Sequence, residues 1–194
     1  MIFDDILDYY FNHFFGKTRD RLDEERNTLL QQAILFFSNE LNITKGSVYD
    51  VKYFDTLDNA EASISYEGNL TYFIKIKKNK FFICQLSTLA HELIHAQQMD
   101  RGELQVFPGY IMWKGQRHNN VVITQEKWED LPWEQDAIKR QHALSVEFLK
   151  HLMMKRHPIR NFFINKFGKD TTLTAEFTLH YLFPYLKKNP LEYK

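Results

Sequence analysis

The sequence predicts a single α+β domain, in which a small and mostly antiparallel sheet packs against helices. Apolar residues recur at helical spacing in the N-terminal and C-terminal parts of the chain, whereas the middle holds short alternating stretches typical of strands. Of the 194 residues, 44% are hydrophobic, which is enough for one sizeable core. No internal repeat and no Pro/Gly-rich linker divides the sequence. We therefore expect one domain over residues 1–194, with N-terminal helices over 1–45, a functional core over 46–157 and C-terminal helices over 158–194.

Two helices are predicted before the sheet. Over residues 3–15 aromatic and aliphatic side chains recur at helical spacing with acids between them, which indicates an amphipathic helix. We expect its aromatic face to be core; a dimer contact or a membrane-surface face is the alternative, and the acids disfavour the membrane. A second helix is predicted over residues 20–41. Six of its apolar side chains should face inward: Leu22, Leu29, Leu30, Ala33, Ile34 and Phe37.

The first group of strands is predicted between this helix and a central one. Apolar and β-branched residues indicate strands around 48–57, 62–66 and 70–76, with a turn between the last two. The central helix should cover residues 81–101, because its apolar residues follow a helical period. Gly102 is its expected C-cap.

Further strands and helices are predicted after Gly102. Short apolar stretches indicate strands at 105–107, 111–113 and 121–123. Pro132 opens a long helix that should reach about residue 156, since proline is favoured in the first helical turn. One or two more helices are expected within residues 160–187.

The central helix carries His91-Glu92-Leu93-Ile94-His95, an H-E-x-x-H pattern. Residues four apart lie on one face of a helix, so both imidazoles can reach one metal ion, and Glu92 lies beside a metal-bound water as a potential general base. The alternative is a chance match with hydrogen-bonded core histidines. The surrounding apolar residues indicate that this helix is buried, where unpaired polar groups cost about 1–3 kcal/mol each. A metal ion would satisfy both rings.

A catalytic zinc site needs a third protein ligand. The metzincin extension requires glycine at 98 and histidine at 101, and this chain has Gln98 and Arg101, which excludes that subtype. Glu134 is the best candidate, because it follows the helix start at Pro132 and shares a stripe with Ile138, Gln141, Ser145 and Phe148. Asp136 falls on a stripe with Arg140 that we expect to be solvated. An acid favoured only by the helix dipole is the alternative for Glu134.

These two motifs together resemble those of a known group of enzymes. His91-Glu92-Leu93-Ile94-His95-Ala96-Gln97, followed by Trp133-Glu134-Gln135-Asp136-Ala137, is similar to the paired motifs of gluzincin-type zinc metallopeptidases. More narrowly, the chain resembles small zincin-like proteins of phages and bacteria with a W-E-x-x-A second motif, some of which are SprT-like. The resemblance covers roughly residues 46–150. It implies a zincin-like fold, with the H-E-x-x-H helix and a second, glutamate-bearing helix packed on the sheet.

Carried over residue by residue, the resemblance implies that His91, His95 and Glu134 bind one Zn²⁺ ion and that Glu92 is the general base. It also implies that the strand over residues 70–76 is a sheet edge lining the cleft, to which a peptide substrate adds by backbone hydrogen bonds; an ordinary core strand is the alternative. The chain departs from SprT-like proteins in two ways. Their third ligand is usually histidine, and this chain has no cysteine-rich zinc ribbon. Both departures weaken a DNA-repair role.

The predicted function is therefore zinc-dependent hydrolysis of a peptide or protein substrate. Zinc lowers the pKa of bound water toward about 7, and Glu92 takes the proton and later gives it to the leaving amine. One alternative is a binding or regulatory protein that keeps the zincin fold with little or no catalysis. Another is a SprT-like protease associated with nucleic acid.

A donor to the oxyanion is also expected, and five side chains are chemically able to act: Tyr110, His118, His142, His180 and Tyr181.

The composition limits the partners and the location. Acids and bases number 25 each, so the chain lacks the basic excess of a typical nucleic-acid binder. The single cysteine, Cys84, fits a reducing compartment. The acidic N-terminus does not resemble a signal peptide, and no run of 18 apolar residues predicts a membrane span. We expect a cytoplasmic protein, located in the host cytoplasm if a phage encodes it; the oligomeric state is not predicted.

Overall fold

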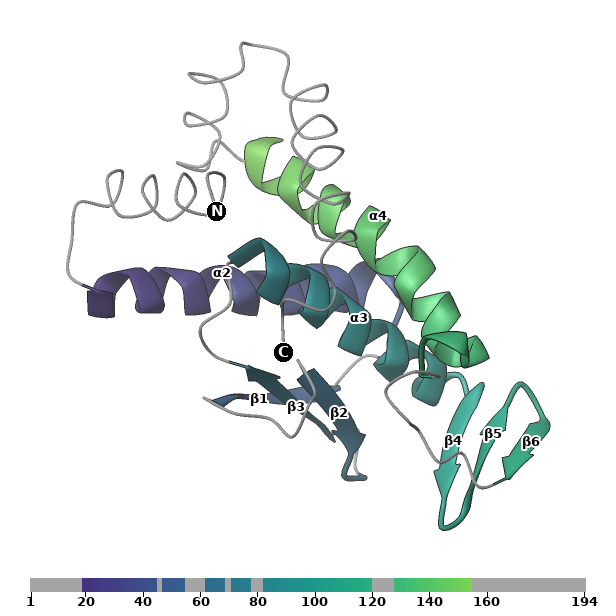
Figure 1. Cartoon of the computed structure of the whole chain (residues 1–194). Helices are drawn as coiled ribbons and strands as arrows, with labels where there is room; N and C mark the ends of the chain where they lie inside the picture. Colours follow the sequence, from purple (N-terminus) through teal and green to yellow (C-terminus); the bar gives the residue numbers. More distant parts are fainter. Residues whose placement is uncertain are drawn as a thin grey trace.

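The computed structural model of this chain describes residues 19–44, 47–54, 62–68, 71–77, 82–119 and 128–154. The helix predicted over 3–15, the strand over 121–123 and the helices over 160–187 lie outside these residues. The described elements are mixed α and β (Figure 1). In chain order they are α2 (Arg19–Glu40), β1 (Val48–Phe54), β2 (Ala62–Tyr66), β3 (Thr71–Lys77), α3 (Phe82–Asp100), β4 (Leu104–Phe107), β5 (Tyr110–Trp113), β6 (Gln116–Asn119), the 3₁₀ turn η1 (Trp128–Asp130) and α4 (Pro132–Met154).

The described strands form two three-stranded sheets where we predicted one. In the first sheet the order is β1-β3-β2, with β1 parallel and β2 antiparallel to β3. The second sheet, β4-β5-β6, is an antiparallel meander that lies beside the first turn of α4 (Figure 1). Only the β1–β3 pairing is parallel among the described strands, so most pairings are antiparallel, as expected.

The expectation that the strand before the central helix, now α3, is a sheet edge is wrong. That strand is β3, and β1 and β2 pair with it on either side over almost its full length. Its backbone groups are therefore already used, and no substrate strand can add to it. The strand predicted at 70–76 is confirmed, and its alternation is reflected in burial, since Tyr72, Ile74 and Ile76 are all in the core. Alternation does not report which strands become neighbours.

Strand β6 was missed because its four residues, Gln116–Asn119, are polar and show no apolar alternation. Its formation follows from the turn before it. Lys114 and Gly115 both have positive φ values, of 47° and 80°, as a two-residue type I′ turn requires. Trp113 pairs with Gln116 across this turn, so the turn sets the register of β5 and β6.

Helices α2 and α3 both end at a left-handed residue that satisfies their last carbonyl groups. At Gly102, with φ of 67°, the N–H of Glu103 bonds the carbonyl of Gln98 at 2.8 Å and the N–H of Gly102 bonds Met99 at 2.9 Å. Asn42, with φ of 51°, ends α2 with the same pair of bonds. These are Schellman motifs, and they confirm the predicted C-cap at Gly102.

The main core lies between the three helices and the first sheet. It contains the predicted inward residues of α2 from Leu29 to Phe37, the apolar side chains of α3, and the buried face of β3. A smaller cluster of Leu104, Trp113 and Trp133 joins the second sheet to the start of α4.

None of the helices within the described ranges is long and apolar enough to cross a membrane.

Ala137 lies in the main core with no exposed surface, one turn after Glu134 on α4. We predict that Ala137→Leu destabilises the metal-free protein by about 1–3 kcal/mol, because the larger side chain overpacks the contact between α4 and α3. Urea denaturation measures the effect. Ala143→Leu, on the exposed face of the same helix, is the control and should change stability by less than about 0.5 kcal/mol. Equal stability of the two variants would contradict the close packing at Ala137.

Candidate metal centre

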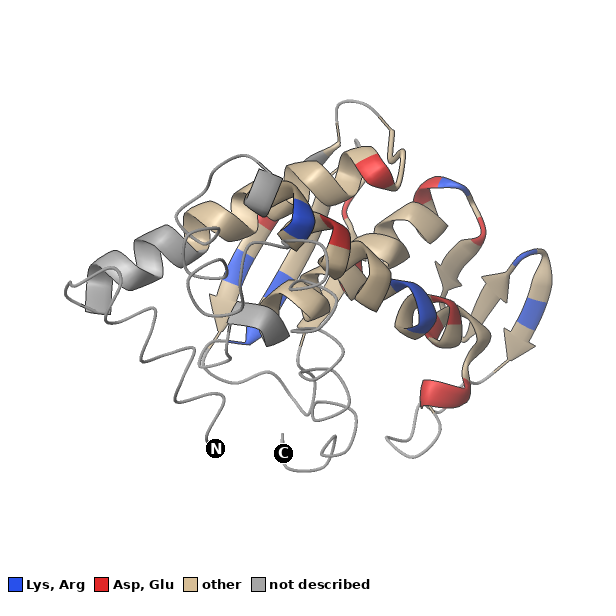
Figure 2. Ribbon diagram, turned by 90° about the horizontal axis from the view of Figure 1, so that it is seen from above, with Lys and Arg blue, Asp and Glu red and all other residues tan. Residues whose placement is uncertain are grey.

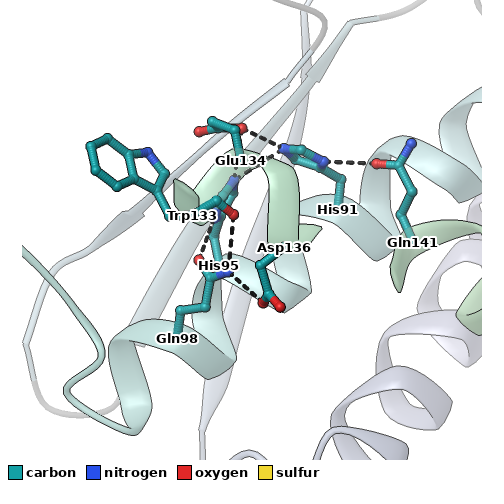
Figure 3. Close-up of polar contacts among 7 residues, drawn as sticks. All are labelled: His91, His95, Gln98, Trp133, Glu134, Asp136 and Gln141. Carbon is teal, nitrogen blue, oxygen red and sulfur yellow. Dashed lines mark hydrogen bonds and ion pairs between the residues drawn. The ribbon is translucent and has the colours of Figure 1, made fainter. Parts of the chain in front are cut away.

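The three predicted ligands meet at the crossing of α3 and α4 (Figure 3). His91 and His95, one turn apart on α3, bring their Nε2 atoms to 3.0 Å from each other. The Oε2 atom of Glu134 lies 3.0 Å from the Nε2 atom of His91 and 3.3 Å from that of His95. Three potential ligand atoms from residues up to 43 positions apart in the sequence therefore form one small triangle.

Helix α4 presents Glu134 to this triangle because of the residues on either side of it. Trp133 is buried in the small cluster with Leu104 and Trp113, and Ala137 is buried in the main core. Glu134 lies between these two fixed points in the first turn. Two turns further along the same stripe of α4, Gln141 places its Oε1 atom 2.7 Å from Nδ1 of His91. The predicted stripe from Glu134 to Gln141 thus faces the histidines.

Gln98 fixes the tautomer of His95. The Nε2 amide group of Gln98 donates to the backbone oxygen of Trp133 at 3.1 Å and to Oδ2 of Asp136 at 2.9 Å. Both partners only accept hydrogen bonds, so Oε1 of Gln98 must be the atom that lies 2.8 Å from Nδ1 of His95. Nδ1 of His95 therefore carries the hydrogen and donates it. The Nε2 atom of the neutral ring then has its lone pair directed at Glu134 and His91.

The donor atoms present fit a zinc ion. Both rings make hydrogen bonds through their Nδ1 atoms, so their Nε2 lone pairs are free. The triangle then consists of two imidazole lone pairs and a carboxylate oxygen, which repel one another unless a cation lies between them. A single proton bridges only two acceptors, whereas a tetrahedral metal takes all three and keeps a fourth position open. With bonds of about 2.0–2.1 Å, tetrahedral zinc places its ligand atoms about 3.3 Å apart. The separations of 3.0, 3.0 and 3.3 Å are close to that value.

The electrostatics of the site follow from burial and from these contacts. Burial alone would raise the pKa of Glu134, but without a metal a proton on Nε2 of either ring is donated to this carboxylate, and these contacts with His91 and His95 outweigh burial and lower the pKa of Glu134 to about 2. For His95 burial lowers the pKa, but the hydrogen bond and the charge of Glu134 outweigh burial and raise it. Glu134 is therefore ionised at neutral pH, as a metal ligand must be.

Glu92 has a different environment. Its side chain is buried, and burial is the main cause of its raised pKa. Within the described part of the chain its carboxylate makes no hydrogen bond or ion pair, in contrast to Glu134. An acid that is buried beside two imidazoles and not held by another side chain is suited to taking up and releasing a proton.

Several functional contacts were not predicted from the sequence. Gln98 and Gln141 orient the two histidines, and a glutamine gives no sequence signal for that role. Trp128, in η1, packs its ring edge-on at 6.1 Å from the ring of His91. Asp136, expected to be solvated, has a side chain that is only 29% exposed and bonds Gln98. The expectation is wrong for the start of this stripe, where Asp136 and Arg140 bond Gln98 and Gln97 of α3, but Ala143 and Glu147 further along the stripe are exposed as expected.

None of the described candidates for an oxyanion donor bonds the three ligand residues. Tyr110 stacks on Phe107 and lies under the guanidinium of Arg117. His118 packs edge-on against Trp133 at 5.4 Å. His142 lies on α4 with contacts elsewhere. His180 and Tyr181 lie outside the described residues.

No protein-family model, no curated protein and no solved structure matches this chain. Support for a metal site at these residues therefore comes from their geometry and from the two sequence motifs.

We predict that purified protein binds one zinc ion and that Glu134→Ala removes most of this affinity, because one of three ligand atoms is lost. At zinc concentrations one hundred times the dissociation constant, the metal should stabilise the wild-type protein by about 2.7 kcal/mol. Chelator competition and thermal unfolding with and without zinc measure both effects. Glu129→Ala, which removes an exposed acid just before α4, is the control and should bind zinc as the wild type does. Equal zinc affinity in both variants would show that Glu134 is not a ligand.

Proposed function

We propose that this protein is a zinc-dependent hydrolase of peptide or other amide bonds, with His91, His95 and Glu134 as ligands and Glu92 as general base. The observation that carries the proposal is the triangle of three ligand atoms, no two of them more than 3.3 Å apart, with the buried Glu92 next to His91 on the same helix. The sequence resemblance to gluzincin-type peptidases supports the same assignment.

The donor set favours zinc over other common metals. Two imidazole nitrogens and one carboxylate oxygen are typical of catalytic zinc, which leaves one position for water or substrate. Magnesium and calcium prefer oxygen ligands and higher coordination numbers, and neither suits a site with two histidines. When bound here, zinc would supply an acidified water and would polarise a substrate carbonyl.

The chain's own residues would then carry the proton. Glu92, with a carboxylate that no other described side chain holds, accepts a proton from the attacking water and delivers it to the leaving nitrogen. Gln98 and Gln141 keep the imidazoles turned so that their Nε2 atoms face Glu134. Glu134 neutralises part of the metal charge and remains ionised because its pKa is held at about 2.

A peptide or protein is the proposed substrate class, and the cytoplasm is the proposed location. The described helices and strands carry acidic and basic residues in an interspersed pattern (Figure 2). This distribution differs from the single-sign stripe that phosphate backbones require. We therefore do not favour a nucleic-acid substrate.

We predict that Glu92→Gln lowers the hydrolysis rate by about 10²–10⁴-fold, because glutamine keeps the shape of the side chain but cannot accept the proton. Zinc should remain bound at the wild-type ratio. Turnover of a fluorogenic peptide library by the zinc-loaded protein measures the rate, and metal analysis measures the occupancy. Glu147→Gln, an exposed acid further along α4, is the control and should keep full activity.

Two outcomes would contradict the proposal in different ways. Full activity of Glu92→Gln would remove Glu92 from the chemistry but leave the metal site in place. A zinc-loaded wild type that cleaves nothing in peptide and protein libraries would favour a binding protein that uses the same fold.

A further inference from the structure

The hydrogen bond that orients His95 is the first link of a longer network. Behind Gln98, the Oδ2 atom of Asp136 accepts from two donors: Nε2 of Gln98 at 2.9 Å and Nη1 of Arg140 at 2.9 Å. The second guanidinium nitrogen of Arg140 donates to Oε1 of Gln97. Nε2 of Gln97 in turn donates to the backbone oxygen of Leu41, at the end of α2.

The network joins all three described helices through buried amides. Gln97 and Gln98 are consecutive on α3, and the two residues are only 3% and 1% exposed. Each amide makes hydrogen bonds through both its oxygen and its nitrogen, so neither can turn over without leaving a buried group unpaired. Asp136 and Arg140 are half-buried, lie one turn apart on α4 and form an ion pair at 2.9 Å. Figure 3 shows the contact between Asp136 and Gln98.

The orientation of Gln98 depends on Asp136. The carboxylate oxygen accepts only, so it requires the nitrogen of the Gln98 amide on its side and the oxygen on the side of His95. Without this acceptor, the remaining bond from Gln98 to the backbone oxygen of Trp133 is a single contact at 3.1 Å. The Gln98 amide could then present its nitrogen to His95, which would favour the other ring tautomer and place a hydrogen on the Nε2 atom.

From this arrangement we infer that Asp136, held by Arg140, is a positioning residue that keeps the Nε2 atom of His95 free to bind the metal. The inference rests on the proposed zinc site but assigns a role to residues that do not touch the metal. Both bonds to Asp136 end on the same oxygen atom, so the role requires an acceptor at that point and not a negative charge.

Three variants of one position test this inference. Asp136→Ala removes the acceptor, and we expect cobalt, as a visible substitute for zinc, to bind about ten- to hundredfold more weakly, as is usual when a partner of a ligating histidine is lost. Asp136→Asn retains one oxygen that both donors can share, so its affinity should stay close to that of the wild type. Glu147→Ala, an exposed acid on the same helix, is the control and should bind cobalt as the wild type does.

The ring tautomer gives a readout that needs no metal. In metal-free, ¹⁵N-histidine-labelled protein at alkaline pH, the nitrogen chemical shifts of wild-type His95 should show the hydrogen on Nδ1 alone. Asp136→Ala should shift the signals toward a mixture of the two tautomers, and Asp136→Asn should not. A wild type that shows this tautomer but binds no cobalt or zinc would refute the proposed function and leave the role of Asp136 as an orienting group intact.

Three results would overturn the inference while leaving the proposed function standing. One is a wild-type His95 with its hydrogen on Nε2, and another is an Asp136→Ala protein with wild-type tautomer and cobalt affinity. The third is an equal loss of affinity in Asp136→Asn and Asp136→Ala, which would assign the effect to charge.

If Asp136→Ala does not fold, Arg140→Lys replaces it. One ammonium group cannot hold both Asp136 and Gln97 as the guanidinium does, so an intermediate loss of cobalt affinity is expected, and unchanged affinity overturns the inference.

Discussion

The contact between the first turn of α4 and the side of α3 is the constraint on which the rest of this structure depends. It is made by Trp133, which is buried against Leu104 and Trp113, and by Ala137, which is buried in the main core. Glu134 lies between them, so its backbone cannot move away from the histidines without unpacking one of two cores. Burial of a large apolar side chain contributes about 1.5–3 kcal/mol, so the position of the carboxylate is secured by packing that is independent of metal. The site is thus largely preorganised by hydrophobic contacts.

Holding the site in place by packing has a cost in stability, because it brings hydrogen-bond acceptors together and removes water from them. Each buried polar group left unpaired would cost about 1–3 kcal/mol, and α3 buries Glu92, His95, Gln97 and Gln98 within two turns. The glutamine network offsets this cost for three of the four residues. Glu92 is the exception among these four, since its carboxylate has no hydrogen-bond partner within the described residues, and burial raises its pKa. The Oε1 atom of Gln85, also on α3, has no partner within the described residues either, so the case for Glu92 in the chemistry comes from its place next to His91 and from its carboxyl group, which can take up a proton.

The sequence predicted the parts of this protein that depend on local periodicity. The bounds of α3 agree with the prediction within about two residues, α4 begins at Pro132 as predicted, and the stripe that selected Glu134 over Asp136 does face His91. Features that depend on neighbours distant in the chain were missed. Alternation along β3 could not show that β1 pairs with it in parallel. A polar strand such as β6 has no apolar alternation, and only the turn before it indicates that it forms. Gln98 and Gln141 were missed because an amide that orients a histidine resembles any other polar residue in a helix.

The choice of amides as partners of the histidines follows from charge. Metal-ligating histidines often donate their second N–H to a carboxylate, which makes the ring a stronger ligand. Here Glu134 and Glu92 already bring two negative charges to a buried site, and the proposed zinc ion would balance them. Two further carboxylates in place of Gln98 and Gln141 would leave an excess of two negative charges at low effective dielectric, where uncompensated charge is costly. The neutral amides orient the rings without that excess. The one carboxylate of the network, Asp136, lies a step further out, where Arg140 pairs with it at 2.9 Å.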